Sequence, residues 1–113
     1  MGMPYHSSPL DLAFYALSDP TRRAVVSRLG GGELPVTALA APFDMALPSF
    51  SQHLKVLEEC GLIISEKRGR SRWCRLVPER FDAAADWMET ERRHAAERLN
   101  RLERYLDRMQ KER

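Results

Sequence analysis

The sequence predicts a mainly α-helical fold with one small β-hairpin, in the order α-α-α-α-β-β-α. In the first half of the 113 residues, four short amphipathic segments each open at a proline. Two segments of alternating polarity then flank a turn that contains Gly69, and a helical repeat occupies most of residues 78–113. The length fits a single domain.

Composition and cysteine content exclude several protein classes. Hydrophobic residues make up 43% and charged residues 30% of the chain, which excludes a disordered tail and a disulfide-rich miniprotein. No apolar run approaches the length of a membrane-spanning helix, and no signal-peptide pattern is present. Cys60 and Cys74 are too few for a disulfide framework. We therefore expect a cytoplasmic location with both thiols reduced.

Positive charge is concentrated in one short segment. The formal net charge is only +2, but residues 67–77 contain five basic residues and no acidic one, whereas residues 1–66 are net negative. The five are Lys67, Arg68, Arg70, Arg72 and Arg75. They lie within the predicted hairpin, which points to nucleic acid as the partner.

Two N-terminal helices have clear start signals. Ser8-Pro9 and Asp19-Pro20 each place a capping side chain before a proline suited to the first helical position. The second helix ends at the three glycines 30–32. The first carries an apolar stripe at helical spacing, formed by Leu10, Ala13, Phe14 and Leu17.

The next segments predict a helix-turn-helix followed by a hairpin. A short helix opens at Pro35 and stops at Pro42, and after a tight turn a longer helix runs from about Leu47 to Gly61. Its predicted buried face is Leu47, Phe50, Leu54 and Leu57. Strands are predicted at 62–67 and 72–77. Alternation allows the core-facing strand residues to be Ile64, Cys74 and Leu76.

Polar residues of the longer helix and basic residues of the hairpin are candidates for contact with double-stranded DNA. Ser and Gln near a helix N-terminus can bond phosphates and base edges, and alternating arginines can follow a phosphate backbone. The candidates are Ser49, Ser51, Gln52, His53, Lys55, Lys67, Arg68, Arg70 and Arg72. Alternatively, both sets are ordinary solvated surfaces, and His53 is a structural hydrogen-bonding group.

The C-terminal helix carries an apolar seam that no later segment of the sequence covers. From Ala95 to Met109 its apolar residues are spaced 4, 3, 4 and 3 apart, as in a coiled coil. We expect a second copy of the chain to cover this seam across a two-fold axis. The predicted homodimer interface contains residues of the first and last helices, namely Leu10, Phe14, Leu17, Trp87, Ala95, Leu99, Leu102 and Leu106.

An ordered set of motifs runs through residues 10–80. It comprises Asp19-Pro20-Thr21-Arg22-Arg23, Leu39-Ala40, the stretch Leu47–Ile63, and Arg68-Gly69-Arg70 with Cys74-Arg75-Leu76. Together these motifs resemble the ArsR family of winged helix-turn-helix repressors. The resemblance implies a recognition helix at Leu47–Cys60 and a wing at Lys67–Arg75. The family usually has Ser or Thr where Ala46 stands, and Asp44 is the candidate replacement for this helix cap.

The resemblance also implies a domain organisation and a function. We expect one winged-helix DNA-binding domain over 1–113, with an N-terminal arm (1–8), the helix-turn-helix and wing (9–77) and a long dimerisation helix (78–113). The expected function is a sequence-specific transcriptional regulator, a homodimeric repressor that binds an imperfect palindrome in its own promoter region.

Metal sensing is not expected, because the ligand sets implied by the resemblance are incomplete. His94 and Glu97 supply only half of one family site on the last helix. The remaining ligand positions of the two family sites hold Pro35, Thr37, Phe81 and Ala83. The last helix, including Asp86-Trp87-Met88-Glu89, instead resembles a non-metal-sensing subgroup. We therefore predict no metal site and no cofactor, and leave open an unidentified effector.

Two other functions remain compatible with the sequence. One alternative is a dimeric protein-interaction module, and another is a thiol- or metal-responsive sensor that uses Cys60, Cys74 or His94. An enzyme is not expected, because His53 and Cys60 are seven residues apart on one helix, too far for a nucleophile and its base. The sequence also has no phosphate loop and no zinc-protease motif.

Overall fold

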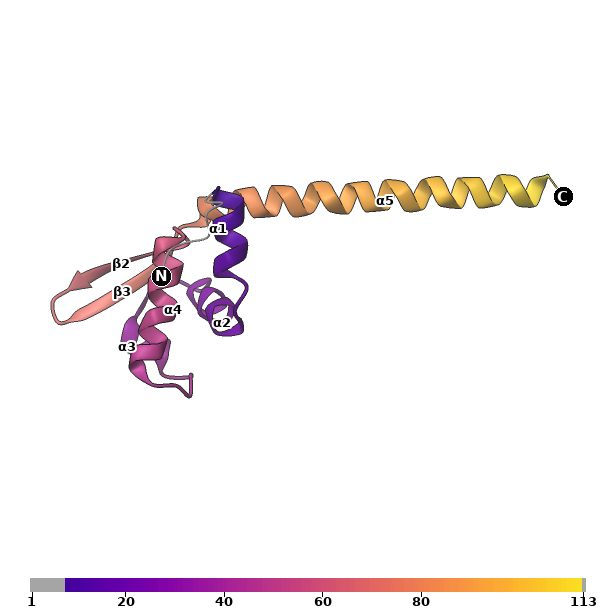
Figure 1. Ribbon diagram of the computed structural model, residues 1–113. Coiled ribbons are helices and arrows are strands. Elements are labelled where there is room, and N and C mark those ends of the chain that lie inside the picture. Colours follow the sequence, from indigo (N-terminus) through magenta and orange to yellow (C-terminus); the bar gives the residue numbers. More distant parts are fainter. Residues whose placement is uncertain (1–7, 113) are drawn as a thin grey trace.

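The computed structural model describes residues 8–112, which form a small body with one long projecting helix (Figure 1). The helices are α1 (Pro9–Ala16), α2 (Pro20–Leu29), α3 (Val36–Ala40), α4 (Leu47–Glu59) and α5 (Asp82–Lys111). The strands are β1 (Leu34–Pro35), β2 (Ile63–Arg68) and β3 (Ser71–Leu76), and the short 3-10 helix η1 (Pro78–Phe81) precedes α5. The predicted mainly α fold with a small hairpin is confirmed, whereas β1 and η1 were not predicted. The expected arm at 1–8 lies almost entirely outside the described residues.

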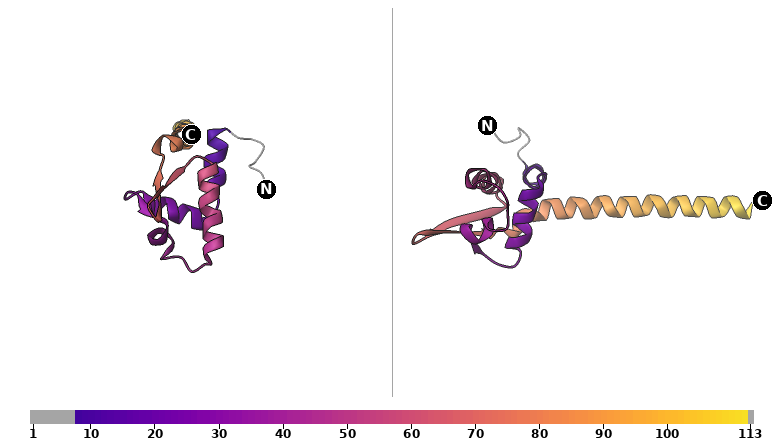
Figure 2. Two further views of the ribbon diagram at one scale, coloured as in Figure 1. Left: turned by 90° about the vertical axis from the view of Figure 1, so that its left-hand side faces the viewer. Right: turned by 90° about the horizontal axis from the view of Figure 1, so that it is seen from below.

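The hairpin and α5 leave the body in opposite directions (Figures 1 and 2), and the molecule measures 76 × 30 × 23 Å. Buried side chains from α1 to α4 and from the sheet form one core between these two extensions. Its largest fully buried side chains are Phe50, Leu39, Leu57, Leu62, Ile63, Val25 and Cys74. This core holds α4 and the base of the hairpin in fixed positions relative to each other.

Side-chain caps begin the first two helices as predicted. Ser8 Oγ accepts the N–H of Asp11 at 3.2 Å, and Asp19 Oδ2 accepts the N–H of Arg22 at 3.0 Å. Each bond satisfies a backbone donor that the first turn of a helix leaves unpaired. Pro9 and Pro20 occupy the first helical positions. The caps fix where the chain turns between α1 and α2.

The start of α4 differs from expectation at two residues. Ala46 is the N-cap and no side chain caps the helix, so Asp44 does not replace the missing hydroxyl. Leu47, predicted to be buried, is 60% exposed. It is the first residue of the helix, and its side chain points back beyond the helix start, where the core does not extend. The remaining predicted residues, Phe50, Leu54 and Leu57, are buried.

The sheet is antiparallel in the order β1-β3-β2. Arg68 pairs with Ser71 across a two-residue turn whose first residue, Gly69, has φ +61°. A positive φ at this position is typical of a type II′ hairpin turn and favours glycine. On the other edge, Leu34 of β1 pairs with Cys74. This short pairing ties the segment before α3 to the hairpin.

Strand register corrects one predicted core residue. Ile63 pairs with Leu76 and Ser65 pairs with Cys74, so these four side chains share the face toward the core. Ile63 is 2% exposed, while Ile64 lies on the opposite face and is 43% exposed. Residues 62–64 are all apolar, so alternation alone does not decide which isoleucine faces inward.

Helix α5 packs against the body only near its start. Phe14 of α1 meets Trp87 edge-to-face with ring centroids 5.7 Å apart, and Ala84 is the one buried residue of the described helix. Beyond this contact the helix continues into solvent for several turns (Figure 2). None of the described helices combines the length and apolar character needed to cross a membrane.

Removing the Asp19 cap should reduce stability in a pH-dependent manner. We expect Asp19→Ala to lower the free energy of unfolding by about 1 kcal/mol at neutral pH. Partial burial raises the pKa of Asp19, but the N–H of Arg22 and the nearby His53 and Arg22 side chains outweigh it and hold the pKa below 3.8. A carboxyl with a lowered folded-state pKa stabilises the fold above the unfolded-state value and loses this effect on acidification.

Urea unfolding followed by circular dichroism checks this prediction between neutral and acidic pH. The difference between Asp19→Ala and wild type should shrink as the pH falls below 3.8 and reach its minimum only at a pH below the lower folded-state pKa. Asp44→Ala, which removes an aspartate that caps no helix, is the matched control and should change stability little. Equal losses in both variants would contradict the cap assignment.

Candidate nucleic-acid interface

Helix α4 presents a polar face on the side opposite its core contacts. The candidate residues Ser49, Ser51, Gln52 and Lys55 are exposed on this face. Lys55 Nζ lies 4.0 Å from Glu59 Oε1 one turn later, an exposed pair that contributes little energy. The helix therefore holds hydroxyl, amide and ammonium groups ready for an external partner.

His53 lies on the edge of this face and contacts α2. Its Nδ1 is 3.3 Å from Nη1 of Arg22 and 3.7 Å from Oδ2 of Asp19. Arg22 also donates from Nε to the carbonyl of Ala16 at 2.7 Å and from Nη2 to that of Tyr15 at 3.2 Å. This half-buried cluster connects α1, α2 and α4, and it favours the structural role for His53.

The α4-facing side of the hairpin carries two of the predicted basic residues. Lys67 pairs with Arg72 on the strand face that also holds Ser65. Arg72 Nη1 donates to Ser65 Oγ at 3.1 Å, and the same hydroxyl bonds to the carboxylate of Glu58 on α4. This chain of bonds connects the hairpin to α4. Arg70 is exposed in the turn at the hairpin tip.

Arg68 has a different environment on the opposite strand face. Its guanidinium bonds in a two-pronged manner to Glu33, at 2.7 and 2.9 Å, and also to Glu66. It lies over the ring of Trp73, 5.1 Å from the centroid. Hydrogen bonding to Arg68 holds the pKa of Glu33 below its usual value. Arg68 therefore clamps β2 to the loop after α2, and its charge is already balanced.

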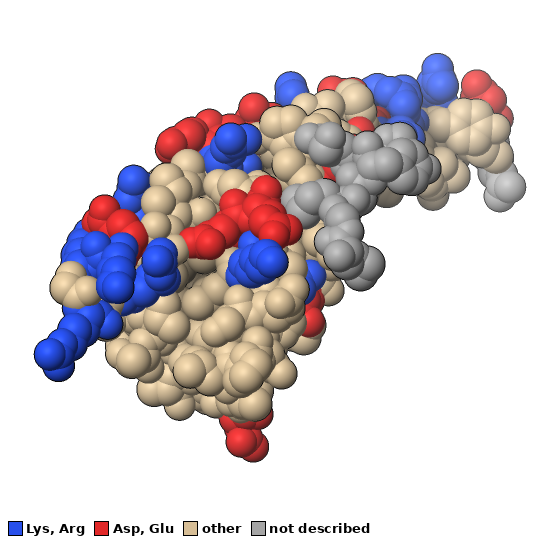
Figure 3. Space-filling view, turned by 60° about the vertical axis from the view of Figure 1, so that its left-hand side comes forward, with Lys and Arg blue, Asp and Glu red and all other residues tan. Residues whose placement is uncertain are grey.

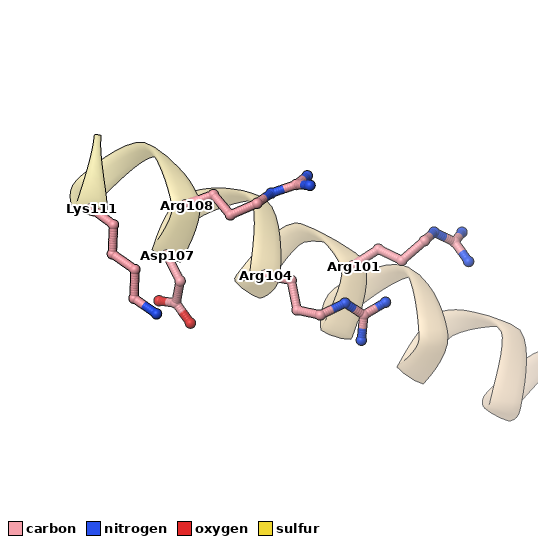
Figure 4. Close-up of a pocket in the computed structure, with 5 residues that line it drawn as sticks. All are labelled: Arg101, Arg104, Asp107, Arg108 and Lys111. Carbon is pink, nitrogen blue, oxygen red and sulfur yellow. The ribbon is translucent and has the colours of Figure 1, made fainter. Parts of the chain in front are cut away.

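Lys and Arg side chains gather at the end of the molecule that carries the hairpin (Figure 3). The distal part of α5 has a second basic surface, shown in Figure 4, which is formed by Arg101, Arg104, Arg108 and Lys111 together with Asp107. All five project from one helix, so the depression between them is open and no other described element encloses it. The hairpin surface, in contrast, adjoins the polar face of α4.

Both thiols belong to the core. Cys60 and Cys74 are free and buried, and burial raises the pKa of each thiol above its usual value. A buried neutral thiol packs as a small hydrophobic group and is a poor nucleophile. Among residues 8–112 no three His, Cys, Asp or Glu side chains are grouped in a way that could hold a metal ion. His94 and Glu97 are exposed on α5.

An exposed apolar surface extends from α1 along α5. Phe14 and Trp87 begin it, and Ala95 is also exposed. Leu10 and Leu17 of the predicted interface are half-buried and pack partly against the core of their own chain. The exposed large residues of α5 are Trp87, Met88, Leu99, Leu102, Tyr105, Leu106 and Met109. A surface of this extent is typical of a protein–protein contact.

Known proteins similar to this chain regulate transcription. A family described as a helix-turn-helix domain matches residues 17–66. The HTH-type transcriptional regulator Rv2034 of Mycobacterium tuberculosis is 43% identical over 76 residues, which are 67% of this chain and 70% of the relative. The transcriptional repressor SdpR of Bacillus subtilis is 32% identical over 75 residues, 66% of this chain and 83% of the relative.

A solved structure decides the family. The crystal structure of an ArsR family transcriptional regulator superposes with a TM-score of 0.73 and 44% identity, over 83% of this chain and 97% of that chain. The chain belongs to the ArsR family. The resemblance noted from the sequence motifs is confirmed, and so is the winged helix-turn-helix fold. Since its relatives are transcriptional regulators and it belongs to the ArsR family, the chain is a transcriptional regulator.

Sequence reasoning missed the residues that position this interface. Arg22 was noted only as part of a family motif, and Glu33 and Trp73 received no role. The position of Arg22 three residues after the Asp19 cap was an available signal. In contrast, Glu33 lies 35 residues before Arg68, and nothing in the sequence indicates that the two side chains meet.

Substitution of Arg68 and Arg70 should weaken DNA binding in different ways. Arg70→Ala removes an exposed cation, so the slope of log affinity against log salt should fall by about one unit for each phosphate contact that the variant no longer makes. Arg68→Ala releases the clamp without removing a phosphate contact, so affinity should fall while the slope stays unchanged. Fluorescence anisotropy on a random duplex across a salt series measures both.

Arg68→Lys is the control for the clamp. It keeps the charge but cannot bond Glu33 through two parallel donors, so it should behave like Arg68→Ala. A reduced salt slope for Arg68→Ala would show that this guanidinium leaves its carboxylates for phosphates. If the salt dependence of binding were unchanged in Arg70→Ala, the hairpin would be an ordinary solvated surface and not a DNA contact.

Proposed function

We propose that this ArsR protein is a homodimeric repressor that binds an imperfect palindrome in its own promoter region. One arrangement carries the proposal: the exposed polar face of α4 adjoins the hairpin face that holds Lys67 and Arg72, with Arg70 at the tip. A helix fits the major groove while neighbouring basic side chains contact phosphates or the minor groove. Since a transcriptional regulator works on DNA, we place it in the cytoplasm.

The candidate residues divide into contacts and supports. Gln52 is suited to base edges, because its amide can bond adenine through two hydrogen bonds. Because no side chain caps α4, its first N–H groups are available to a phosphate. We assign DNA contacts to Ser49, Ser51, Gln52, Lys55, Lys67, Arg70 and Arg72. His53 and Arg68 position these residues instead, since both are held by neighbours within the chain.

The apolar surface of α1 and α5 is the proposed dimer contact. A two-fold axis through it would bury the seam around Leu99, Leu102 and Leu106 with one self-complementary contact. Two copies of α4 would then enter successive major grooves about 34 Å apart. Occupation of the promoter by this dimer would exclude RNA polymerase.

We also assign the chain to a non-metal-sensing part of the family. Pro35 and Thr37 offer neither thiolate nor imidazole, and Ala83 cannot ligate a metal. His94 and Glu97 supply only half of the ligand set that the family site on the last helix requires of each chain.

Gln52→Ala should discriminate between the promoter sequence and random DNA. The loss of base-edge hydrogen bonds should cost about 1–3 kcal/mol for each half-site of the true operator. Binding to random DNA draws mainly on phosphate charge and should change much less. Anisotropy titrations on both duplexes at one salt concentration measure the difference. Gln110→Ala, a glutamine on the distal part of α5, is the matched control and should leave both affinities unchanged.

If Gln52→Ala weakened binding to the operator and to random DNA equally, Gln52 would not contact base edges. The operator itself comes from sequencing of fragments that the pure protein selects from a random pool. Selected sequences without two-fold symmetry would contradict the palindromic dimer.

A charge placed in the α5 seam should dissociate the dimer. Light scattering of the wild type should give about 26 kDa at micromolar concentration, twice the chain mass of 13.0 kDa. Leu102→Glu buries two carboxylates at the two-fold contact and should shift the mass toward one chain. Asn100→Glu introduces the same side chain outside the seam and should remain dimeric. A wild-type protein that is monomeric and still binds a palindrome tightly would contradict the proposed dimer interface.

A further inference from the structure

A cavity that is open to solvent on one side lies between α4 and the hairpin. It has a volume of about 220 Å³ and is bounded by α3, α4, β2 and β3. Its deepest residues are Leu54 and Cys74, which are buried, and half-buried Val36 completes an apolar floor. The cavity is separate from the exposed seam of α5 and from the clamp around Arg68. Any occupant would touch both elements that the proposed function brings to DNA.

The rim of this cavity carries charge. Lys55 of α4 and Arg72 of β3 both line it, and Ser51 adds a hydroxyl. Glu58 also lines it, but its carboxylate already accepts a hydrogen bond from Ser65. Arg72 uses one donor on the same hydroxyl and keeps the others, as Lys55 keeps its ammonium donors. The lining therefore has a net charge of one positive unit above an apolar floor.

The volume and this charge together define a ligand class. An enclosed, dry cavity of about 150 Å³ lined by leucine, isoleucine and phenylalanine side chains can hold benzene. The larger space here has room for one ring or a short branched chain together with a small head group. A single net positive charge matches one carboxylate better than a doubly charged phosphate, since Glu58 would repel the second charge. Carboxylates also accept strong charge-assisted bonds from lysine and arginine.

We propose that this cavity binds a small organic monocarboxylate and that its occupation releases the protein from DNA. The apolar body would lie on Val36, Leu54 and Cys74, and the carboxylate would bond Lys55 and Arg72. The second half of the proposal rests on the proposed function, because Ser51, Lys55 and Arg72 are also assigned to DNA. Ligand and DNA would then compete for the same cations.

Benzoate is the probe for binding, with benzyl alcohol and benzylamine as neutral and cationic probes of similar size. Amide chemical shifts are recorded for the free protein at constant ionic strength. Benzoate should perturb residues that line the cavity, including Leu54, Ser65 and Cys74. We expect it to bind at least threefold more tightly than benzyl alcohol, and benzylamine to bind more weakly than either. No saturable shift, or shifts confined to the arginines of distal α5, would overturn the site.

Two variants test separately the contribution of the positive charge at the rim and that of the apolar volume of the cavity. Lys55→Gln should abolish the preference for benzoate over benzyl alcohol and leave benzyl alcohol affinity unchanged. Val36→Phe fills the floor and should remove binding of both. Lys55 is exposed, so its variant tests the site even if Val36→Phe fails to fold. Unchanged benzoate affinity in Lys55→Gln would overturn the carboxylate assignment.

Measurement of operator binding tests the second half of the proposal, the release from DNA. Saturating benzoate should weaken wild-type affinity for the selected operator at least threefold, and it should leave Val36→Phe unaffected. Benzoate that binds in the cavity without weakening operator affinity would overturn the regulatory half. If the protein selects no DNA sequence at all, the proposed function fails, while the chemical-shift experiment still decides whether the cavity is a carboxylate site.

Discussion

One guanidinium, that of Arg22, determines how α4 is held against α1 and α2. It bonds to two carbonyls at the end of α1, which a helix leaves without internal partners, and it reaches His53 in the middle of α4. The same residue donates its backbone N–H to the Asp19 cap of α2. Three helices therefore share one planar, charged group. The orientation of α4 relative to α1, which begins the exposed apolar surface, depends on this connection.

Arg68 repeats this principle at the hairpin. By bonding Glu33 and Glu66 and stacking on Trp73, it fixes the hairpin to the loop after α2. Of the basic residues that make this segment distinctive, one is therefore structural, whereas Arg70 at the tip is exposed. Net charge alone overstates the number of cations that DNA can use, because internal pairing removes some of them.

Local signals in the sequence predicted most of the fold, and contacts between distant residues account for most of the misses. Caps at Ser8 and Asp19 and the turn at Gly69 act over a few residues, so α1, α2 and the hairpin were predictable. β1 has only two residues and exists because β3 offers it an edge. Strand register, which local alternation does not reveal, determines that Ile63 and not Ile64 faces the core. For the candidate site, the exposed residues of α4 followed from helical periodicity, but the separate roles of Arg68 and Arg70 depended on the distant Glu33.

The two-residue strand β1 also determines how large the sheet can become. Its Pro35 has no N–H, so the outer edge of β1 cannot pair fully with another strand. The opposite edge belongs to β2, where Glu66, Lys67 and Arg68 follow one another and oppose association with a second strand. The charged strand proposed to face DNA thus also protects the protein from edge-to-edge aggregation.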